Sequence, residues 1–554
     1  QANEIVEDIL KEFEARIGQF NDPELSLSAI GTTVEPVPHD FTAEWRSDVS
    51  GKYWRDPPGF RRDLTSVYSI SLSTSTRVRS FSRIPLIREA NIQEAYGVFD
   101  LELFGEVDIG HTDEPTGSIL TTGETGRFLQ DQIESEYGVR RRLTSGADVR
   151  LSQRLSTLDN NSEYLDPNPQ SGSEVVLSLV QPILRGGGYD YNKSELRIAV
   201  LDRDVAAVEF LRLVEDHLLE INRAYWGVYL SRAAWLQRKR LLDDTSEILD
   251  ALKEREELDD AATSSELYRA QAALNRRKAE LNRSRMAIRS SEQRLRAMIN
   301  DPAIPMGAAG EIIPSSKPIV SQPQECVQDV ARNALRNRSE MIRAMSTVRA
   351  AAIRRNQAYE DLKPQLDLIG EVGWAGIDGN RRVQGAIDDM TDHGTEWSVG
   401  IRMSVPVEKN LYNGRLKRYD LEFQQRSDDL RIQAEDILLD TLISYQNLIN
   451  SYHDMSGKYQ SVLASRTELR QLRDRMKLED EAAGRSIAYH LQLILDAMDR
   501  NQVFEEEFLV SVVTYNTAIA SVHRVRGKFL QYQNVEILRQ DGDTFDELQL
   551  KIEN

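Results

Sequence analysis

The most regular hydrophobic pattern in the chain changes its period partway along. Val175, Leu177 and Leu179 alternate with Glu174, Val176 and Ser178, which is typical of a strand with one apolar face. After the glycines at 186–188 the spacing becomes helical, and a heptad seam follows: Val214, Ile221, Val228, Trp235, Leu242 and Leu249. We therefore expect a strand that leads directly into a very long helix.

The same change of period recurs later in the chain. Five residues alternate in the stretch 395–407: Trp397, Val399, Ile401, Met403 and Val405. Another helical seam follows them: Leu438, Leu442, Tyr445, Ile449, Tyr452, Tyr459 and Leu463. Tyr191-Asn192 in the first copy corresponds to Tyr412-Asn413 in the second, an offset of 221 residues. The pattern predicts an internally duplicated chain.

A further strand carries acidic side chains on one face. Between 96 and 110, Leu101, Leu103, Val107 and Ile109 alternate with four carboxylates: Asp100, Glu102, Glu106 and Asp108. A hairpin is indicated at 138–155, where Thr144-Ser145-Gly146 forms the turn. Such alternation fits a sheet with water on one side, or a membrane barrel with lipid outside and a wet lumen inside.

These patterns divide the chain into five parts. The first repeat, 64–301, contains strands at about 96–110, 138–155 and 173–182 and helices at about 192–258 and 264–300. The second repeat, 326–535, contains strands at about 365–375 and 395–407 and helices at about 412–478 and 486–535. The remaining parts are an N-terminal extension (1–63), a proline-rich linker (302–325) and a C-terminal tail (536–554). The extension is either an arm laid on the main body or a leader without order.

Composition and charge exclude several classes of function. The 554-residue chain has a formal net charge of −20, which argues against a nucleic-acid partner. Its one cysteine, Cys326, allows neither an internal disulfide nor a multi-cysteine metal site. The seven histidines have no ligand spacing, and we find no nucleophile, acid pair or cofactor loop. We therefore expect no enzyme activity, no cofactor and no metal.

The start of the chain bears on its location. No run of about 18 apolar residues is present, and the first residues have neither a basic start nor an apolar stretch. We expect either a cytosolic protein or a mature chain from which a signal peptide has been removed. Residue 1 is glutamine rather than cysteine, so we expect no lipid anchor.

Several motifs together resemble the TolC family of outer-membrane efflux and secretion channels. They are VQPILRGGG after a strand, its degenerate copy SVPVEKNLYNG, YEDLKPQLDLIGEVGWAG, ALRNRSEMIRA and VTYNTAIASVHR. The resemblance covers roughly 64–535. It implies a homotrimer whose strands form one β-barrel in the outer membrane and whose helices form a tube into the periplasm. It also implies a passive duct that works with a periplasmic adaptor (membrane fusion) protein and an inner-membrane pump.

The resemblance gives the strands and their side chains expected roles. Four strands per chain would give twelve in a trimer, and the hairpin at 138–155 would raise this number to eighteen if it joined the barrel. Asp100, Glu102, Glu106 and Asp108 would then make the lumen acidic, which favours cations. Trp374 and Trp397 are candidates for an aromatic girdle in contact with outer-membrane lipid, and the alternative is packing in a soluble sheet.

In the family, two helix-hairpin tips form a periplasmic gate. The tip motif Gly-x-Arg-Ser-x-x-Asp-x-x-Asp is matched here at Arg485 and Ser486, whereas Tyr489 and Gln492 stand where the aspartates would be. We therefore expect three Tyr489 side chains to close the pore by bulk, with Asp496, one turn after Gln492, supplying the acid instead. Arg485 with Glu266, or with Asp480, is the candidate gate pair, and ordinary solvated charges are the alternative.

Together these expectations describe an α+β membrane protein: a trimeric, transmembrane β-barrel continuous with a long α-helical coiled-coil periplasmic tunnel, internally duplicated. Its function would be that of the outer-membrane exit duct of a tripartite efflux pump or a type I secretion system. The alternative is a soluble coiled-coil scaffold protein with small β inserts, which would explain the heptads but not the repeated strand-to-helix joint.

Overall fold

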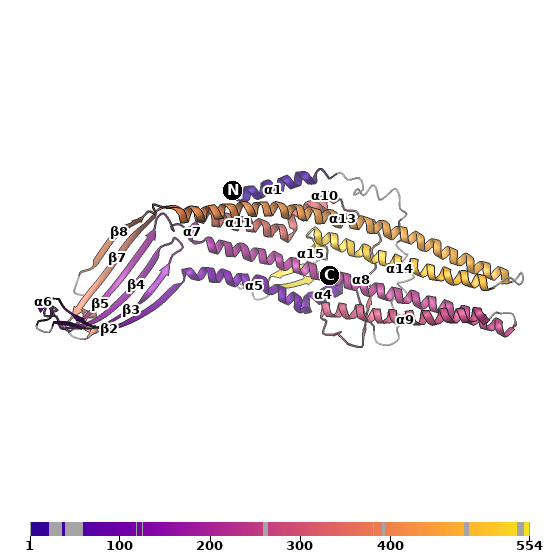
Figure 1. Cartoon of the computed structure of the whole chain (residues 1–554), viewed down its shortest axis with the longest axis horizontal. Helices are drawn as coiled ribbons and strands as arrows, with labels where there is room; N and C mark the ends of the chain where they lie inside the picture. The colour runs from indigo at the N-terminus through magenta and orange to yellow at the C-terminus, as the bar shows by residue number, and fades with distance from the viewer. Residues whose placement is uncertain are drawn as a thin grey trace.

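A computed structural model describes residues 2–20, 36–38, 59–117, 119–123, 126–258, 264–379, 382–390, 394–480, 487–533, 535–539 and 548–552. The molecule is elongated, with one sheet at one end and long helices running away from it (Figure 1). In the part of the chain so described, no helix is both long and apolar enough to cross a membrane.

The main sheet has six strands, each antiparallel to its neighbours, in the order β2-β3-β4-β5-β7-β8. Their bounds are β2 Leu101–Pro115, β3 Arg127–Arg142, β4 Asp148–Asn160, β5 Gln170–Pro182, β7 Gln365–Asp378 and β8 Glu396–Ser404. Of the two counts that the sequence left open, four or six strands per chain, the sheet therefore has six. The predicted hairpin at 138–155 is the turn end of two long strands that belong to the sheet. Residues before 138 continue the strand because Leu129 and Ile133 keep the alternation among polar neighbours.

Two helices run almost the whole length beyond the sheet. They are α8 (Ser194–Leu258) and α13 (Asn410–Asp480), and a helix of 71 residues such as α13 extends about 105 Å. Most of the two expected heptad seams is buried: Val214, Ile221, Val228 and Tyr445 have essentially no exposed surface, whereas Leu463 is 40% exposed. The joint between β5 and α8 turns at Gly186 and Gly188, whose positive φ angles of 83° and 94° favour glycine.

Six shorter helices form two further columns. On one side of α8, α9 (Ser264–Ile299) meets α4 (Leu64–Thr74) and α5 (Thr76–Tyr96) end to end. Between α8 and α13, α14 (Ile487–Val525) meets α10 (Val327–Asn337) and α11 (Ser339–Glu360) in the same way (Figure 1). Near the sheet the order of helices is therefore α5, α8, α11, α13.

The described parts of the N-terminal extension and of the tail contain regular elements. Helix α1 (Ala2–Ile17) packs Val6, Ile9 and Phe13 against α10, α11 and α13, and β1 (Gly59–Arg62) pairs in parallel with β6 (Glu311–Pro314). The last long helix ends at Val525 rather than near 535. The predicted tail contains a hairpin of β9 (Val535–Arg539) and β10 (Leu548–Ile552).

Candidate functional site

One face of the sheet is polar, and the register assigns its residues. Glu102, Glu106 and Asp108 of β2 lie opposite Arg140, Glu136 and Glu134 of β3 and share their face. Asp100 follows the short 3-10 turn η2 (Gly97–Phe99) and precedes the strand. Three of the four predicted acidic residues are therefore brought together on one strand face.

Arginine side chains on the same face of the sheet neutralise part of this negative charge. Arg140 Nη2 lies 2.7 Å from Glu102 Oε1, Arg150 Nη2 lies 2.6 Å from Glu136 Oε1, and Arg154 Nη1 lies 3.3 Å from Glu174 Oε2. The Phe104 ring lies beneath the Arg140 and Arg150 guanidinium groups, 5.8 Å and 4.5 Å from its centroid. The end of the face nearer the helices thus carries paired charges.

Acidic charge is in excess further from the helices. Within the described residues, Glu106, Asp108 and Glu134 have no ion-pair partner, and Glu134 accepts a hydrogen bond from the Gln132 amide. The carboxylate that we expected to contribute at 102 is neutralised, so the net negative charge lies on the outer part of this face.

The opposite face of the sheet is apolar and exposed in the single chain. Leu103 is 80% exposed and Ile109 is 79% exposed. A contiguous exposed apolar face of this kind marks a surface that contacts another apolar surface. Trp374 lies opposite Val175 of β5, and Trp397 lies opposite Val372 of β7, so the register places both rings on this face, in the half of the sheet remote from the helices. Trp374 Nε1 donates to Thr395 Oγ1 at 3.0 Å, so its ring is fixed at the rim.

The predicted gate residues lie at the other end of the molecule. Arg485 is outside the described residues. Asp480, Glu266 and Tyr489 lie within a turn of the ends of α13, α9 and α14, and only their backbone is described. Gln492 and Asp496 are exposed on α14, and Gln492 Nε2 donates to Asp496 Oδ1 at 2.9 Å. The gate pair therefore stays a prediction.

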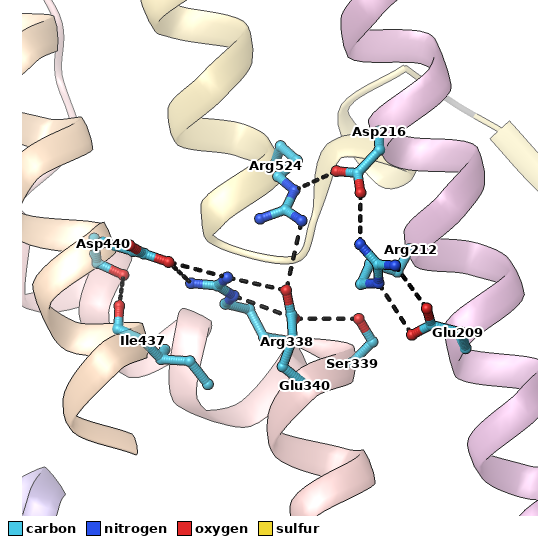
Figure 2. Close-up of polar contacts among 10 residues, drawn as sticks. Glu209, Arg212, Asp216, Arg338, Ser339, Glu340, Ile437, Asp440 and Arg524 are labelled. Atoms are coloured by element: carbon cyan, nitrogen blue, oxygen red, sulfur yellow. Dashed lines mark hydrogen bonds and ion pairs between the residues drawn. The ribbon is translucent and has the colours of Figure 1, made fainter. Parts of the chain in front are cut away.

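A polar network joins four helices where α14 meets α11 (Figure 2). Arg338, 5% exposed at the start of α11, donates to Glu340 Oε1 at 3.0 Å and to Asp440 Oδ2 of α13 at 3.3 Å. Arg524 of α14 donates to Asp216 Oδ1 of α8 at 2.8 Å and reaches Glu340 Oε1 at 3.5 Å.

The network continues along α8 and fixes the joint. Arg212 donates to Asp216 Oδ2 at 2.7 Å and to both oxygens of Glu209. Gly527, with φ +68°, brings the chain after α14 against Asn337, where a Cβ atom would lie 2.9 Å from the Asn337 carbonyl carbon. The ends of α14 and α10 are thereby held against each other.

Two carboxyl groups at this joint have shifted pKa values of opposite sign. Burial by itself would raise the pKa of Glu340, but hydrogen bonds and positive charge from Arg338, with the charge of Arg524, lower it to about 2. Burial raises the pKa of Glu215 to about 7, against the opposing effects of the Leu530 amide and Arg524. Near neutral pH Glu340 is therefore ionised, whereas Glu215 is only partly ionised.

Sequence reasoning did not assign these residues a role. The available signal was Asn337-Arg338-Ser339-Glu340, a segment that was recognised only as part of a motif. Asp440, the partner of Arg338, is 102 residues away in the sequence, and Asp216, the partner of Arg524, is 308 residues away. Local periodicity does not predict contacts at such separations. Among the described residues, no three His, Cys, Asp or Glu side chains gather as a possible metal site.

Comparison with known proteins gives matches at the level of structure alone. No protein-family model matches the chain, and no curated protein matches it in sequence. The Campylobacter jejuni CmeC outer membrane channel matches with a TM-score of 0.57 and 11% identity over 92% of both chains. The outer membrane protein VceC of Vibrio cholerae matches with a TM-score of 0.55 and 12% identity, covering 89% of this chain and 99% of VceC. The open-state MtrE channel of Neisseria gonorrhoeae matches with a TM-score of 0.54 and 14% identity, over 84% of this chain and 89% of MtrE.

These likenesses define a fold class. The chain has the fold of TolC-like outer-membrane channel proteins, helix-rich with a β-sheet part, as its motifs predicted. At 10–14% identity the likeness concerns the fold and leaves the cargo open.

Proposed function

We propose that three copies of this chain form a passive exit duct in the outer membrane of a bacterium, extending into the periplasm. The duct would serve a tripartite efflux pump or a type I secretion system, with a periplasmic adaptor protein and an inner-membrane pump as partners. The chain carries out no chemistry in this proposal, and the pump supplies the energy.

One observation carries the proposal: among the described residues the edge strands β2 and β8 have no outer neighbour, and each is joined to one of the outermost helices. β2 follows α5 and β8 leads into α13, the two outermost helices near the sheet. An open edge strand with an exposed apolar face is a site for pairing with another chain. Pairing β8 and α13 of one copy with β2 and α5 of the next continues sheet and helical wall together. Three copies would then close an eighteen-stranded barrel above a helical tube.

The faces of the sheet support a membrane location. Leu103, Ile109 and Trp397 would face lipid, with both tryptophans in an aromatic girdle, and Glu106 and Asp108 would face the lumen. The repeated order of helix, strands, long helix and returning helix supports an internal duplication, with α5 to α9 corresponding to α11 to α14. A soluble scaffold would leave this apolar face in water, which makes it the weaker reading.

A bilayer experiment tests the duct and its gate together. We expect the detergent-purified protein to form steady, cation-preferring channels in a planar bilayer, and Tyr489→Ala to increase their conductance because it removes bulk from the tip. Val503→Ala, an exposed apolar residue of α14 away from the tip, is the matched control. Unchanged conductance in Tyr489→Ala would keep the duct but move the gate to another residue, Asp496 first. A protein that never inserts from detergent would refute the duct.

A further inference from the structure

A groove lies between the first turns of α8 and the last turns of α11, and its volume is about 740 Å³. Its floor is formed by five apolar side chains: Leu196, Val200 and Leu201 of α8 with Ala352 and Ile353 of α11. Ala2 and Asn3 at the start of α1 also line it. In Figure 1 this region lies next to the sheet, near the label N. The groove is large enough and apolar enough to take a hydrocarbon chain.

Four cationic side chains surround this apolar floor: Lys193, Arg197, Arg349 and Arg355. Among the described residues that line the groove there is no carboxylate. Two of the cations are paired with carboxylates that lie outside it. Arg197 Nη2 lies 2.5 Å from Asp190 Oδ1, and Arg355 Nη1 lies 3.9 Å from Asp420 Oδ1. These two cations are therefore partly compensated.

The other two cations have no carboxylate partner in the part of the chain that the structure describes. Lys193 Nζ lies 5.5 Å from the centroid of the Tyr189 ring, and Arg349 Nε donates to Asn3 Oδ1 at 3.1 Å. Both contacts are with neutral groups, so the positive charge stays uncompensated. In a chain with a net charge of −20, this local excess of positive charge favours an anionic ligand.

The groove begins at the depth where the apolar band of the sheet ends. The apolar face of β2 runs from Leu101 to Ile109, which is about 26 Å along the strand and about 20 Å across a membrane at a tilt of about 40°. An outer-membrane barrel presents an apolar band of about 25 Å. Exposed apolar residues extend this band past the strand ends, with Val98 before β2 and Val407 after β8. The band therefore reaches the first turn of the long helices, beside the groove.

In the proposed ring of three copies, the groove faces outward and stays open. Helix α1 forms an additional layer over α10, α11 and α13, and three such layers inside the ring would obstruct the duct. The side of the wall that carries α1 is therefore the outer one. Copies meet through α5 and α13, whereas the groove lies between α8 and α11, the two inner helices of the wall. A neighbouring copy does not cover it.

We propose that this groove binds an anionic phospholipid from the inner leaflet of the outer membrane, with an acyl chain on the apolar floor and the phosphate held by the surrounding cations. Basic pockets at the membrane boundary of helices recognise anionic head groups, and arginine suits phosphate in particular. A free phosphate ion would leave the five apolar side chains of the floor without a partner. This inference rests on the proposed function, because that function places the groove at the membrane.

Lipid binding to the full-length protein in a non-ionic detergent tests the groove. Native mass spectrometry during titration with phosphatidylglycerol gives the affinity. Phosphatidylcholine with the same acyl chains is the zwitterionic match, and glycerol phosphate is a competitor that has the charge without the chain. The test variant is Lys193→Gln with Arg349→Gln. The control is Lys278→Gln with Arg294→Gln, which removes two exposed cations of α9, away from the groove.

We expect phosphatidylglycerol to bind the wild type and the control variant equally, at about one molecule per chain, and to lose at least about tenfold in affinity for the test variant. Phosphatidylcholine should bind at least about tenfold more weakly, and glycerol phosphate should not compete. Equal affinity for the two lipids, or an equal loss in the test and control variants, would overturn the proposal. Competition by glycerol phosphate would also overturn it, because the cations would then bind a soluble anion.

A second pair of variants tests the apolar floor. Val200→Trp should fill the groove and weaken the binding of phosphatidylglycerol, whereas Val503→Trp, at an exposed position of α14, should leave it unchanged. Binding that is unchanged in Val200→Trp would refute an acyl chain on this floor.

Channel recordings on the same preparations separate this inference from the duct. If the wild type and the variants conduct, a failed lipid test leaves the duct intact, and if none conducts, the duct itself has failed. A stronger cation preference in Lys193→Gln with Arg349→Gln, with lipid binding unchanged, would place the groove in the lumen and overturn the proposal.

Discussion

Replacing Arg338 should loosen the joint between α11 and α14 by a calculable amount. The pKa of Glu340 falls from an ordinary 4.5 to about 2 in the folded chain, a change equivalent to about 3 kcal/mol. Because Glu340 is partly accessible to solvent, we discount this to about 2 kcal/mol. Arg338→Met would remove most of it and leave Glu340 partly buried without its main partner.

The expected result is faster unfolding. A loss of about 2 kcal/mol from the native state alone speeds unfolding by about 30-fold. The rate is followed by circular dichroism in detergent at a fixed guanidinium concentration, which is suitable for a large protein whose unfolding is not reversible. Because the folded pKa is lowered, the contribution of Glu340 is complete above about pH 4.5 and is lost as the pH falls through about 2.

A double-mutant cycle separates the pair from its surroundings. Arg338→Met, Glu340→Gln and the double variant are compared with Arg343→Met, an exposed arginine on the same helix. Coupling of about 2 kcal/mol between the two sites is expected. Strict additivity, or an Arg338→Met unfolding rate equal to that of Arg343→Met, would refute the reasoning.

Two further outcomes follow from the carboxylates. Glu106→Gln with Asp108→Asn should reduce the cation preference in bilayer reversal potentials more than Glu102→Gln, because Glu102 is already paired with Arg140; equal effects would contradict the charge distribution on the polar face. Burial raises the pKa of Glu215 to about 7, so its ionisation destabilises the fold and stability should fall as pH rises from about 4.5 to 7. Glu215→Gln should remove this trend and slow unfolding at pH 8 by about tenfold or more, whereas a pH profile identical to that of the wild type would contradict it.

The sequence was most informative where one pattern persists. The alternation at Val175, Leu177 and Leu179 and the seam from Val214 to Leu249 depend on local periodicity, and both features are present in the structure. The sequence did not show that β3 begins at 127, because between 129 and 137 one face carries only Gln and Glu and the other mixes Leu129 and Ile133 with Asp131 and Ser135. Such a strand is stabilised by neighbours on both sides, and a single sequence does not show them.

The candidate site also contains residues that local patterns predict and residues whose roles depend on contacts distant in the sequence. The acidic face of β2 follows from alternation, but its compensation by Arg140 depends on which strand lies beside it and in which register. The gate at Tyr489 was inferred from a motif and stays a prediction. The joint at Arg338 depends on four helices meeting, and no local pattern specifies that meeting.

The apolar seams hold the helices together, whereas the polar joint determines how the helices are positioned along their axes. A heptad seam such as that of α13 is nearly the same after a shift of seven residues, so apolar packing alone leaves the longitudinal position of a helix weakly defined. Arg338 can reach Asp440 of α13 in one register only, and Arg524 can reach Asp216 of α8 and Glu340 of α11 in one register only. A buried ion network adds little net stability over an apolar core, but its disruption is costly. The polar residues at the joint thus fix the longitudinal position of α11 and α14 relative to the two long helices, α8 and α13. Because α8 and α13 are connected to the sheet, the joint also fixes how far α14 lies from the sheet.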